Sequence, residues 1–230
     1  MSHCRRLIVD RIYRMAPWRL FGQKIGGLCI ASLLAVHSGG AFALGPSQQA
    51  AIDLGAKAEI SKLETYLNSV RTVHSSFVQA TSNGHVAEGT LYLSRPGKLR
   101  IDYKPPAQLQ IFGDNIWLIF VDEELREVNQ LPIGATPAAL LLQDNIRLSG
   151  DIKVQRITRR DGVIRLHLIQ AKEPDAGQLI VAIAEAPLGL RGWAVIDAQG
   201  IETTVTLIGP TINGNIADRV FVYSPPSWMN

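Results

Sequence analysis

The 230-residue sequence predicts a mainly β fold of about ten or eleven antiparallel strands with a helical lid. Short runs of alternating apolar and polar residues follow one another through most of the chain, and each run ends at turn residues. The chain also lacks the regular strand–helix alternation that is typical of a parallel sheet. We therefore expect an antiparallel sheet with one apolar face.

The stretch 89–121 shows this pattern most clearly. Apolar and polar residues alternate on both sides of a tight turn, Arg95-Pro96-Gly97-Lys98, in which proline presets φ and glycine accepts a positive φ. Pro105-Pro106 ends the second run, and Gly113-Asp114-Asn115 turns the chain into 116–121. Because 116–121 is apolar at every position, we expect both faces of this second half of the meander to be covered.

Further strands are expected on both sides of this meander, most of them joined by short turns. Asn83-Gly84 and Asp161-Gly162 are strong hairpin signals. The remaining predicted strands start at Phe77 or span 85–94, 125–131, 152–159, 163–170, 179–185, 190–197, 201–208 and 219–223. We expect all of them to belong to one domain from residue 44 to residue 230.

Two segments carry a helical pattern instead. In 47–73 apolar residues recur every three or four positions among lysine and glutamate, with a break expected near Gly55. The segment 138–142 reads as a short apolar helix that Thr136 can cap and that Pro137 can begin. Both helices need an apolar surface to cover, so we expect them to form a lid; ordinary core packing explains their stripes equally well.

The first 43 residues have the features of an export signal. A basic region precedes an apolar segment, 25–36, and Ala41-Phe42-Ala43 supplies the small residues that precede a cleavage site. We expect cleavage after Ala43, and a start at Met15 would give a leader of ordinary length. An uncleaved anchor and a twin-arginine signal at Arg5-Arg6 are the alternatives.

The mature chain offers little that points to catalysis, a cofactor or a metal. It has no cysteine, because Cys4 and Cys29 both lie in the leader. The histidines His74, His85 and His167 are far apart in sequence, and the chain has no G-x-S-x-G motif and no glycine-rich phosphate loop. We therefore predict a protein that is not an enzyme and needs no cofactor or metal.

Charge gives no support for nucleic-acid binding. From residue 44 onward 17 Lys/Arg face 19 Asp/Glu, a net charge of −2. Asp122-Glu123-Glu124 lacks the ligand spacing of a calcium loop and fits a solvated hairpin tip. Arg156, Arg159 and Arg160 flank a hairpin and fit a solvated edge that resists sheet-to-sheet pairing.

Several motifs follow in order along the mature chain. They are the helix 63–73 with His74 to Gln79, then Glu88 to Pro96, Tyr103 to Pro106, Ile111 to Trp117, the proline-led helix 136–142, and Phe221 to Pro226. In this order they resemble the LolA family of periplasmic outer-membrane lipoprotein carriers.

The resemblance implies an incomplete antiparallel β-barrel whose apolar concave side is closed by helices. It implies a periplasmic chaperone that accepts outer-membrane lipoproteins from an ATP-driven transporter in the inner membrane. The carrier would shield their acyl chains and pass them to an acceptor at the outer membrane. We expect a monomer, with no nucleic-acid partner. A lipid- or lipoprotein-sensing module of the same fold is the alternative.

The resemblance also assigns site residues. Arg95 matches the family arginine that ties the sheet to the lid helices in the closed, empty state, a task that suits a guanidinium fork; a turn arginine exposed to water is the alternative. Alternation assigns a set of apolar residues to the acyl-chain cavity or, equally, to ordinary core: Phe77, Leu91, Leu93, Leu99, Ile101, Leu109, Ile111, Trp117 and Ile119, with Leu67, Leu140, Leu141 and Leu142 below the lid.

Two departures from the family pattern affect these assignments. The chain stops at Trp228-Met229-Asn230, whereas some members continue into a further strand. The loop Gly113-Asp114-Asn115 is shorter than the common Asp-Gly turn, so the register through Trp117 can differ by one residue.

Overall fold

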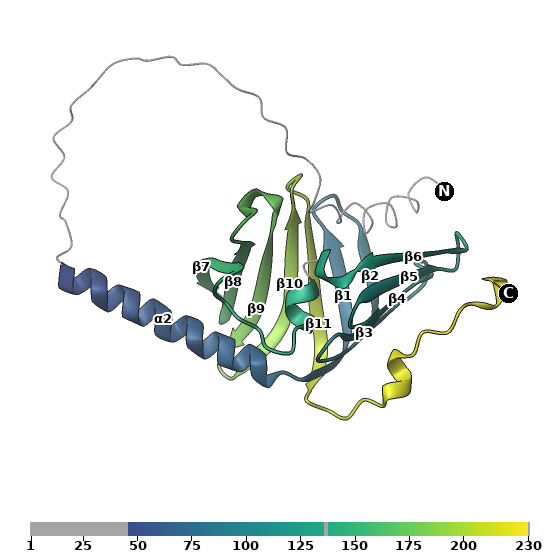
Figure 1. Ribbon diagram of the computed structural model, residues 1–230, viewed down its shortest axis with the longest axis horizontal. Coiled ribbons are helices and arrows are strands. Elements are labelled where there is room, and N and C mark those ends of the chain that lie inside the picture. Colours follow the sequence, from purple (N-terminus) through teal and green to yellow (C-terminus); the bar gives the residue numbers. More distant parts are fainter. Residues whose placement is uncertain (1–45, 136–137, 230) are drawn as a thin grey trace, which may run out of the picture.

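The computed structural model describes residues 46–135 and 138–229 (Figure 1). Eleven strands in the described part of the chain form one antiparallel sheet in the order β6-β5-β4-β3-β2-β1-β11-β10-β9-β8-β7. They are β1 (Thr72–Thr81), β2 (Val86–Ser94), β3 (Lys98–Tyr103), β4 (Leu109–Asp114), β5 (Trp117–Asp122), β6 (Glu127–Pro132), β7 (Ile152–Arg160), β8 (Val163–Gln170), β9 (Gly177–Glu185), β10 (Leu188–Asp197) and β11 (Glu202–Ile212). The edges β6 and β7 do not pair, so the sheet stays open and the predicted fold is confirmed.

The sheet consists of two meanders that meet at its centre. Neighbours in the sheet are neighbours in sequence except at β1 and β11, where Phe77 lies opposite Leu207. In Figure 1, β1–β6 form one half of the curved sheet and β7–β11 the other. The connection from β6 to β7 must therefore cross from one edge of the sheet to the other, and this crossing carries the short helix.

The two α-helices lie on one side of the sheet. Helix α2 (Pro46–Ser69) runs without the break expected at Gly55 and ends before Thr72, where β1 begins. The crossing contains η1 (Ile133–Ala135) and α3 (Ala138–Leu142), and α3 has the predicted bounds. The expected cap and first residue of α3, Thr136 and Pro137, lie outside the described residues, as does the export signal 1–43. No helix in the described ranges is long and apolar enough to span a membrane.

The predicted strand 219–223 is wrong. Asp218–Phe221 forms the 3-10 helix η3, and the chain then runs to η4 (Ser227–Met229); a further 3-10 turn, η2 (Pro174–Ala176), lies before β9. Both sides of β11 are already occupied by β1 and β10, so the segment after it has no adjacent edge to join. It is fastened to β3 instead, where Arg100 Nη1 donates to the Val220 carbonyl at 3.1 Å.

Apolar side chains gather on both faces of the sheet. We call the face toward α2 and α3 the lid face, and the opposite one the outer face. The lid face carries the main core, to which strands of both halves and the two helices contribute. A small second cluster, Phe112, Ile119 and Val121, lies on the outer face under Tyr223 and Trp228 of the C-terminal segment. Both faces of β5 are covered, as its composition predicts.

Candidate functional site

The main core joins the sheet and the lid in one continuous apolar cluster. Eleven of the thirteen residues predicted for the cavity belong to it, ten of them buried and one partly buried. They are Leu67, Phe77, Leu91, Leu93, Leu99, Leu109, Ile111, Leu140, Leu141 and Leu142, with Ile101 partly buried. The lid leucines thus occupy the space over the sheet in this closed state. That acyl chains replace them stays a prediction.

The other two assignments to the lid face, Trp117 and Ile119, are wrong. Trp117 is 40 % exposed, and Ile119 belongs to the outer-face cluster. The pairing explains the error: Ile111 lies opposite Phe120, and Phe112 lies opposite Ile119. Since paired residues share a face, Phe120 points to the lid and Ile119 away from it. A register displaced by one residue through the tight turn moves every side chain to the other face.

The second half of the sheet supplies as much of the lid face as the first half. Leu166, Val181 and Ile183 of β8 and β9 are completely buried in the same cluster. The sequence interpretation placed the cavity only on β1–β5 and on the lid. Alternation in 163–170 and 179–185 marks these residues as apolar, but alternation alone does not place the two strand groups around one interior.

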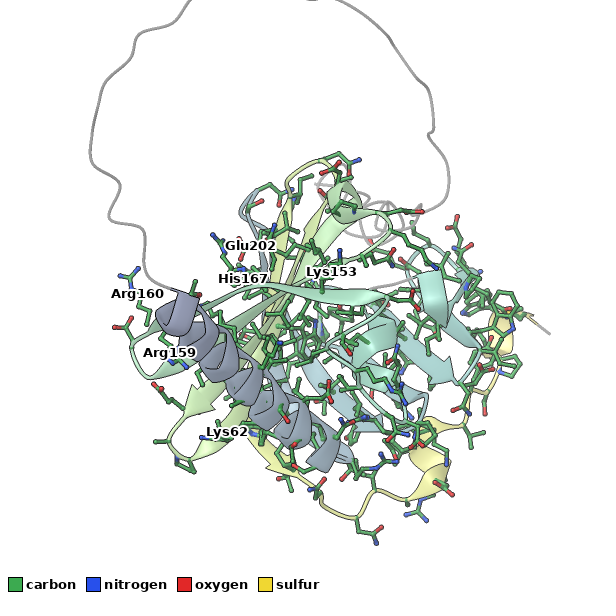
Figure 2. The ribbon with its side chains drawn as sticks, turned by 60° about the vertical axis from the view of Figure 1, so that its left-hand side comes forward. Lys62, Lys153, Arg159, Arg160, His167 and Glu202 are labelled. Atoms are coloured by element: carbon green, nitrogen blue, oxygen red, sulfur yellow. The ribbon has the colours of Figure 1, made fainter. Side chains whose placement is uncertain are left out.

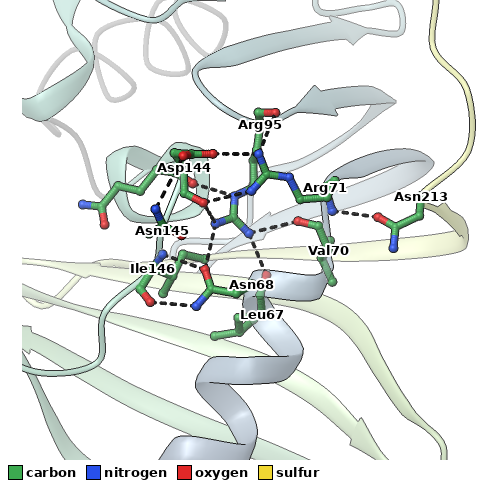
Figure 3. A network of polar contacts seen from close by, with 10 residues as sticks. Leu67, Asn68, Val70, Arg71, Arg95, Asp144, Asn145, Ile146 and Asn213 are labelled. Carbon is green, nitrogen blue, oxygen red and sulfur yellow. Dashed lines mark hydrogen bonds and ion pairs between the residues drawn. The ribbon is translucent and has the colours of Figure 1, made fainter.

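Arg95 lies at the end of β2 and fastens both lid elements to the sheet (Figure 3). Its Nη1 donates to the carbonyl oxygens of Leu67 at 2.6 Å and Val70 at 2.9 Å, at the C-terminal end of α2. Nε donates to the Gln143 carbonyl at 2.6 Å, and Nη2 to the Asp144 carbonyl at 2.9 Å, just after α3.

The five N–H groups of Arg95 have five acceptors in total. The fifth is Asn68 Oδ1, 3.2 Å from Nη2. Arg95 is only 7 % exposed. Four of the acceptors are backbone carbonyls at or just beyond the C-terminal ends of α2 and α3, so one side chain contacts the ends of two helices. The predicted contact between Arg95 and the lid is observed, and the alternative of an exposed turn arginine is wrong.

The positive charge of Arg95 is stabilised by helix ends and not by an ion pair. Burial lowers the pKa of its guanidinium, the neighbouring Arg71 lowers it further, and the Asp144 carboxylate acts in the opposite direction. The partial negative charge at the C-terminal end of α2 favours a cation at this place. Arginine stays protonated in such surroundings because its unperturbed pKa is far above neutral.

A polar row on α2 holds the segment 144–148. Glu64 Oε2 accepts from the Leu148 N–H at 2.7 Å, and Asn68 exchanges two hydrogen bonds with Ile146. Arg71, just past the helix, forms an ion pair with Asp144 at 2.7 Å.

The spacing explains why these contacts fit. Four helical residues, from Glu64 to Asn68, advance about 6 Å along the axis. Two residues of extended chain, from Leu148 to Ile146, advance about 6.6 Å. The segment therefore runs antiparallel to α2 with nearly matched steps.

The sequence interpretation missed this row, although a signal for it exists. The positions 64, 68 and 71 have the same helical spacing as the apolar stripe Leu63, Leu67 and Val70, and they lie directly beside it. A polar row next to a buried stripe indicates a second contact, but the sequence does not say with which segment.

The turn before β3 forms a further contact with the lid. The Gly97 N–H donates to the Leu142 carbonyl at 2.9 Å. Gly97 has φ +69°, and a Cβ at this position would come within 2.5 Å of the Asn115 Cα. Glycine is required here because the turns 95–98 and 113–116 pack backbone to backbone. On the second half of the sheet, the Leu190 N–H of β10 donates to the Tyr66 hydroxyl of α2 at 2.6 Å.

Comparison with known proteins identifies the family. Residues 68–224 match the family described as "Outer membrane lipoprotein carrier protein LolA". The chain belongs to this family. An outer-membrane lipoprotein carrier protein from Methylococcus capsulatus is 29 % identical over 179 residues, which cover 74 % of this chain and 85 % of the relative. One from Chromobacterium violaceum is 35 % identical over 74 % of this chain and 85 % of its own length. The crystal structure of a LolA superfamily protein from Nitrosomonas europaea aligns with 9 % identity and a TM-score of 0.42, covering 71 % of this chain and 97 % of that one.

In this member of the LolA family, His74 and His167 lie on the outer face. His74 stacks on Tyr92 with ring centroids 4.5 Å apart, and both alternate with lid-face residues on their strands. His167 alternates with Leu166 and Leu168, so it points to the outer face, where it contacts Thr158 and Gln178. His85 lies in the turn before β2. Neither His74 nor His167 faces the apolar cluster under the lid.

Proposed function

We propose that the protein carries lipoproteins through the periplasm with their acyl chains sheltered between the lid face and the lid. It accepts them from an ATP-driven transporter of the inner membrane and passes them to an outer-membrane acceptor, acting as a monomer and without catalysis. The observation that carries this proposal is Arg95, whose five hydrogen bonds hold two helix ends over one continuous apolar cluster.

The free energy of exposing acyl chains to water explains why a carrier is needed. Each buried methylene contributes about 0.8 kcal/mol, so three long acyl chains cost on the order of 35 kcal/mol to expose. A lipoprotein without a shield would cross an aqueous compartment at a negligible rate. The lid face offers leucine, isoleucine, valine and phenylalanine side chains from both halves of the sheet.

Release of the cargo requires that the apolar interior be covered again. When lipid leaves, the lid leucines Leu140, Leu141 and Leu142 return to the sheet and the polar contacts of Arg95 re-form. The closed state thus competes with the cargo for the same apolar surface. A few polar bonds decide the balance between the closed state and the cargo-bound state. Each contributes about 1 kcal/mol net to the closed state, while the apolar contacts are similar in both states.

A release assay tests the proposal. Spheroplasts that hold a labelled outer-membrane lipoprotein are incubated with the mature protein, residues 44–230, and the soluble fraction is analysed by gel filtration. We expect a soluble one-to-one complex of protein and lipoprotein. If the protein binds free lipid but releases no lipoprotein, the function is lipid sensing or lipid transport instead.

A further inference from the structure

The β7–β8 hairpin concentrates positive charge in an otherwise acidic body. The segment 152–165 contains five Lys/Arg and one acidic residue, a net charge of +4. The rest of 44–230 contains 12 basic and 18 acidic residues, a net charge of −6. The charge that looks balanced over the whole mature chain is therefore separated in space, and it gives the molecule a strong electrostatic polarity.

Strand pairing places most of these cations on one face. Arg156 lies opposite His167, Thr158 opposite Arg165, and Arg160 opposite Val163. Because Leu166 and Leu168 point to the lid face, Arg165 and His167 point to the outer face, together with their partners.

Arg156 and Arg160 are thus the two diagonal neighbours of Arg165, and Lys153 follows them along the same face of β7. We call Lys153, Arg156, Arg160 and Arg165 the basic hairpin face.

Counter-charges are scarce on this face. In the described ranges Lys153, Arg156 and Arg165 make no ion pair, and Arg160 has only a contact of 3.3 Å with Asp161, both side chains being more than four-fifths exposed. Neighbouring like charges on a sheet destabilise it. Arg159, whose side chain lies on the other face of β7, differs: it bridges Glu59 of α2 and Glu185.

We propose that the basic hairpin face docks the protein on the surface of a bilayer that contains anionic phospholipids. Its cations are borne by two adjacent strands that contain no Phe, Tyr or Trp, whereas the hot spots of protein interfaces are enriched in buried aromatic residues. Mobile lipid phosphates can neutralise such cations without a fixed arrangement of partners. The acidic remainder of the chain is repelled by the same surface, so the field also orients the molecule.

The strand β7, which bears three of the four residues of the docked face, contacts the lid with its other face, where Arg159 pairs with Glu59 of α2. Figure 2 shows Arg159 and Arg160 next to the first half of α2, with Lys153 farther along the same strand. β7 is also the strand that the lid segment 144–148 leads into. Docking would therefore hold the β7 edge of the sheet near a bilayer. Acyl chains would leave or enter that bilayer. The inference adds a membrane contact to the proposed function but does not require the cargo.

Sedimentation with vesicles tests the inference without any lipoprotein, so it can fail independently of the carrier proposal. The mature protein is mixed with vesicles of equimolar phosphatidylglycerol and phosphatidylcholine, or of phosphatidylcholine alone, at low and high salt. Arg156→Glu/Arg165→Glu is compared with Arg126→Glu/Arg219→Glu, which makes the same change in net charge at exposed positions in the other half of the molecule. Thermal unfolding establishes whether both variants are folded. If Arg156→Glu/Arg165→Glu is not folded, Arg156→Gln/Arg165→Gln replaces it.

We expect binding to the anionic vesicles at low salt, loss of binding at high salt and no binding to phosphatidylcholine. The hairpin variant should lose about 10- to 100-fold in partitioning, as expected for removing two basic contacts and adding two acidic ones, while the control loses far less. Absence of binding to anionic vesicles overturns the proposal. Equal losses in both variants overturn it too, because they show that binding depends only on the net charge of the protein. Binding to immobilised polyglutamate without binding to vesicles also overturns it, because this result indicates an acidic protein partner.

Discussion

The side-chain amide of Asn68 and the backbone of Ile146 exchange two hydrogen bonds. Asn68 Nδ2 donates to the Ile146 carbonyl at 2.9 Å, and the Ile146 N–H donates to Asn68 Oδ1 at 2.8 Å. This is the pairing that two strand residues make with each other, so the amide offers the segment 144–148 a substitute for a strand edge. The same Oδ1 accepts from Arg95, which makes Asn68 the residue that contacts the helix, the lid segment and the sheet arginine together (Figure 3).

Arg95→Leu is expected to loosen the lid. The substitution removes five hydrogen bonds. The Leu67 and Asp144 carbonyls keep the Val70 N–H and Arg71 Nη1 as donors, but the Val70 and Gln143 carbonyls keep none among the described residues. The free energy of unfolding should fall by about 3 kcal/mol, as measured in urea, and amide exchange should accelerate in 144–148. In the release assay this variant should still bind lipoprotein but transfer it poorly.

Arg95→Lys is the matched control for this substitution. An ammonium group has three donors for five acceptors, so exchange rates between those of the unchanged protein and of Arg95→Leu are expected. Unchanged exchange in both variants would show that Arg95 does not hold the lid closed.

Asn68→Ala should weaken the contact between α2 and the segment 144–148. Ile146 loses both partners of its backbone groups, so we expect a loss of about 1–3 kcal/mol in the free energy of unfolding. Ser69→Ala is the control, because its hydroxyl donates only to the Tyr66 carbonyl on the exposed helix surface. Comparable losses in the two variants would contradict a specific role for Asn68.

Gly97→Ala should cost more stability than a positive φ alone explains. Both Gly97 and Gly84 have a positive φ, but a Cβ at Gly84 meets nothing within 4 Å, whereas one at Gly97 meets the Asn115 backbone. Gly84→Ala is expected to cost about 1 kcal/mol. We expect Gly97→Ala to exceed this by about 1–2 kcal/mol in denaturant unfolding, since the turn must shift. Equal costs would show that the two turns separate without strain.

Photo-cross-linking distinguishes the two faces of β5. A benzoyl-phenylalanine at position 120 points to the lid face, and one at position 119 points to the outer face. With a lipoprotein bound, we expect cross-links to its acyl chains from position 120 and background yield from position 119. The reverse result would restore the register that the sequence alone indicates.

Tyr103 should make the protein lose stability in alkali. Burial raises the pKa of its hydroxyl above its ordinary value, while in the unfolded chain the group ionises near pH 10. Below about pH 9 both states keep the proton and this group adds no pH dependence. Above about pH 10 the unfolded state alone loses it, so the free energy of unfolding falls by up to about 1.4 kcal/mol per pH unit.

Tyr103→Phe should reduce this alkaline slope. The substitution also removes the hydrogen bond from the Tyr103 hydroxyl to Gln79 Oε1. Gln79→Met removes the same bond but keeps the phenol, and it should retain the slope. A slope that is unchanged in Tyr103→Phe would assign the alkaline transition to other groups.

The sequence determined the elements that depend on neighbours in the chain. Alternation in 89–121 and the turn residues that interrupt it define strands, because turn chemistry and period-2 burial act over a few residues. Arg95 follows the same logic: its place before Pro96 at a tight turn ties it to the end of β2, and a family resemblance could then give it a role. The apolar lid segment 138–142 also needed only its own composition.

Tertiary structure alone decided which partner each element meets. Ile119 and Phe120 are equally apolar, and only the pairing of β5 with β4 decides which of them faces the lid. The C-terminal residues 219–223 have strand-like composition but find no free edge beside β11. The sequence places Asn68 on a helix but does not identify its partner Ile146, which is 78 residues away. These outcomes depend on contacts between segments that are distant in sequence. Such contacts stabilise the chain only after the sheet and the lid have come together.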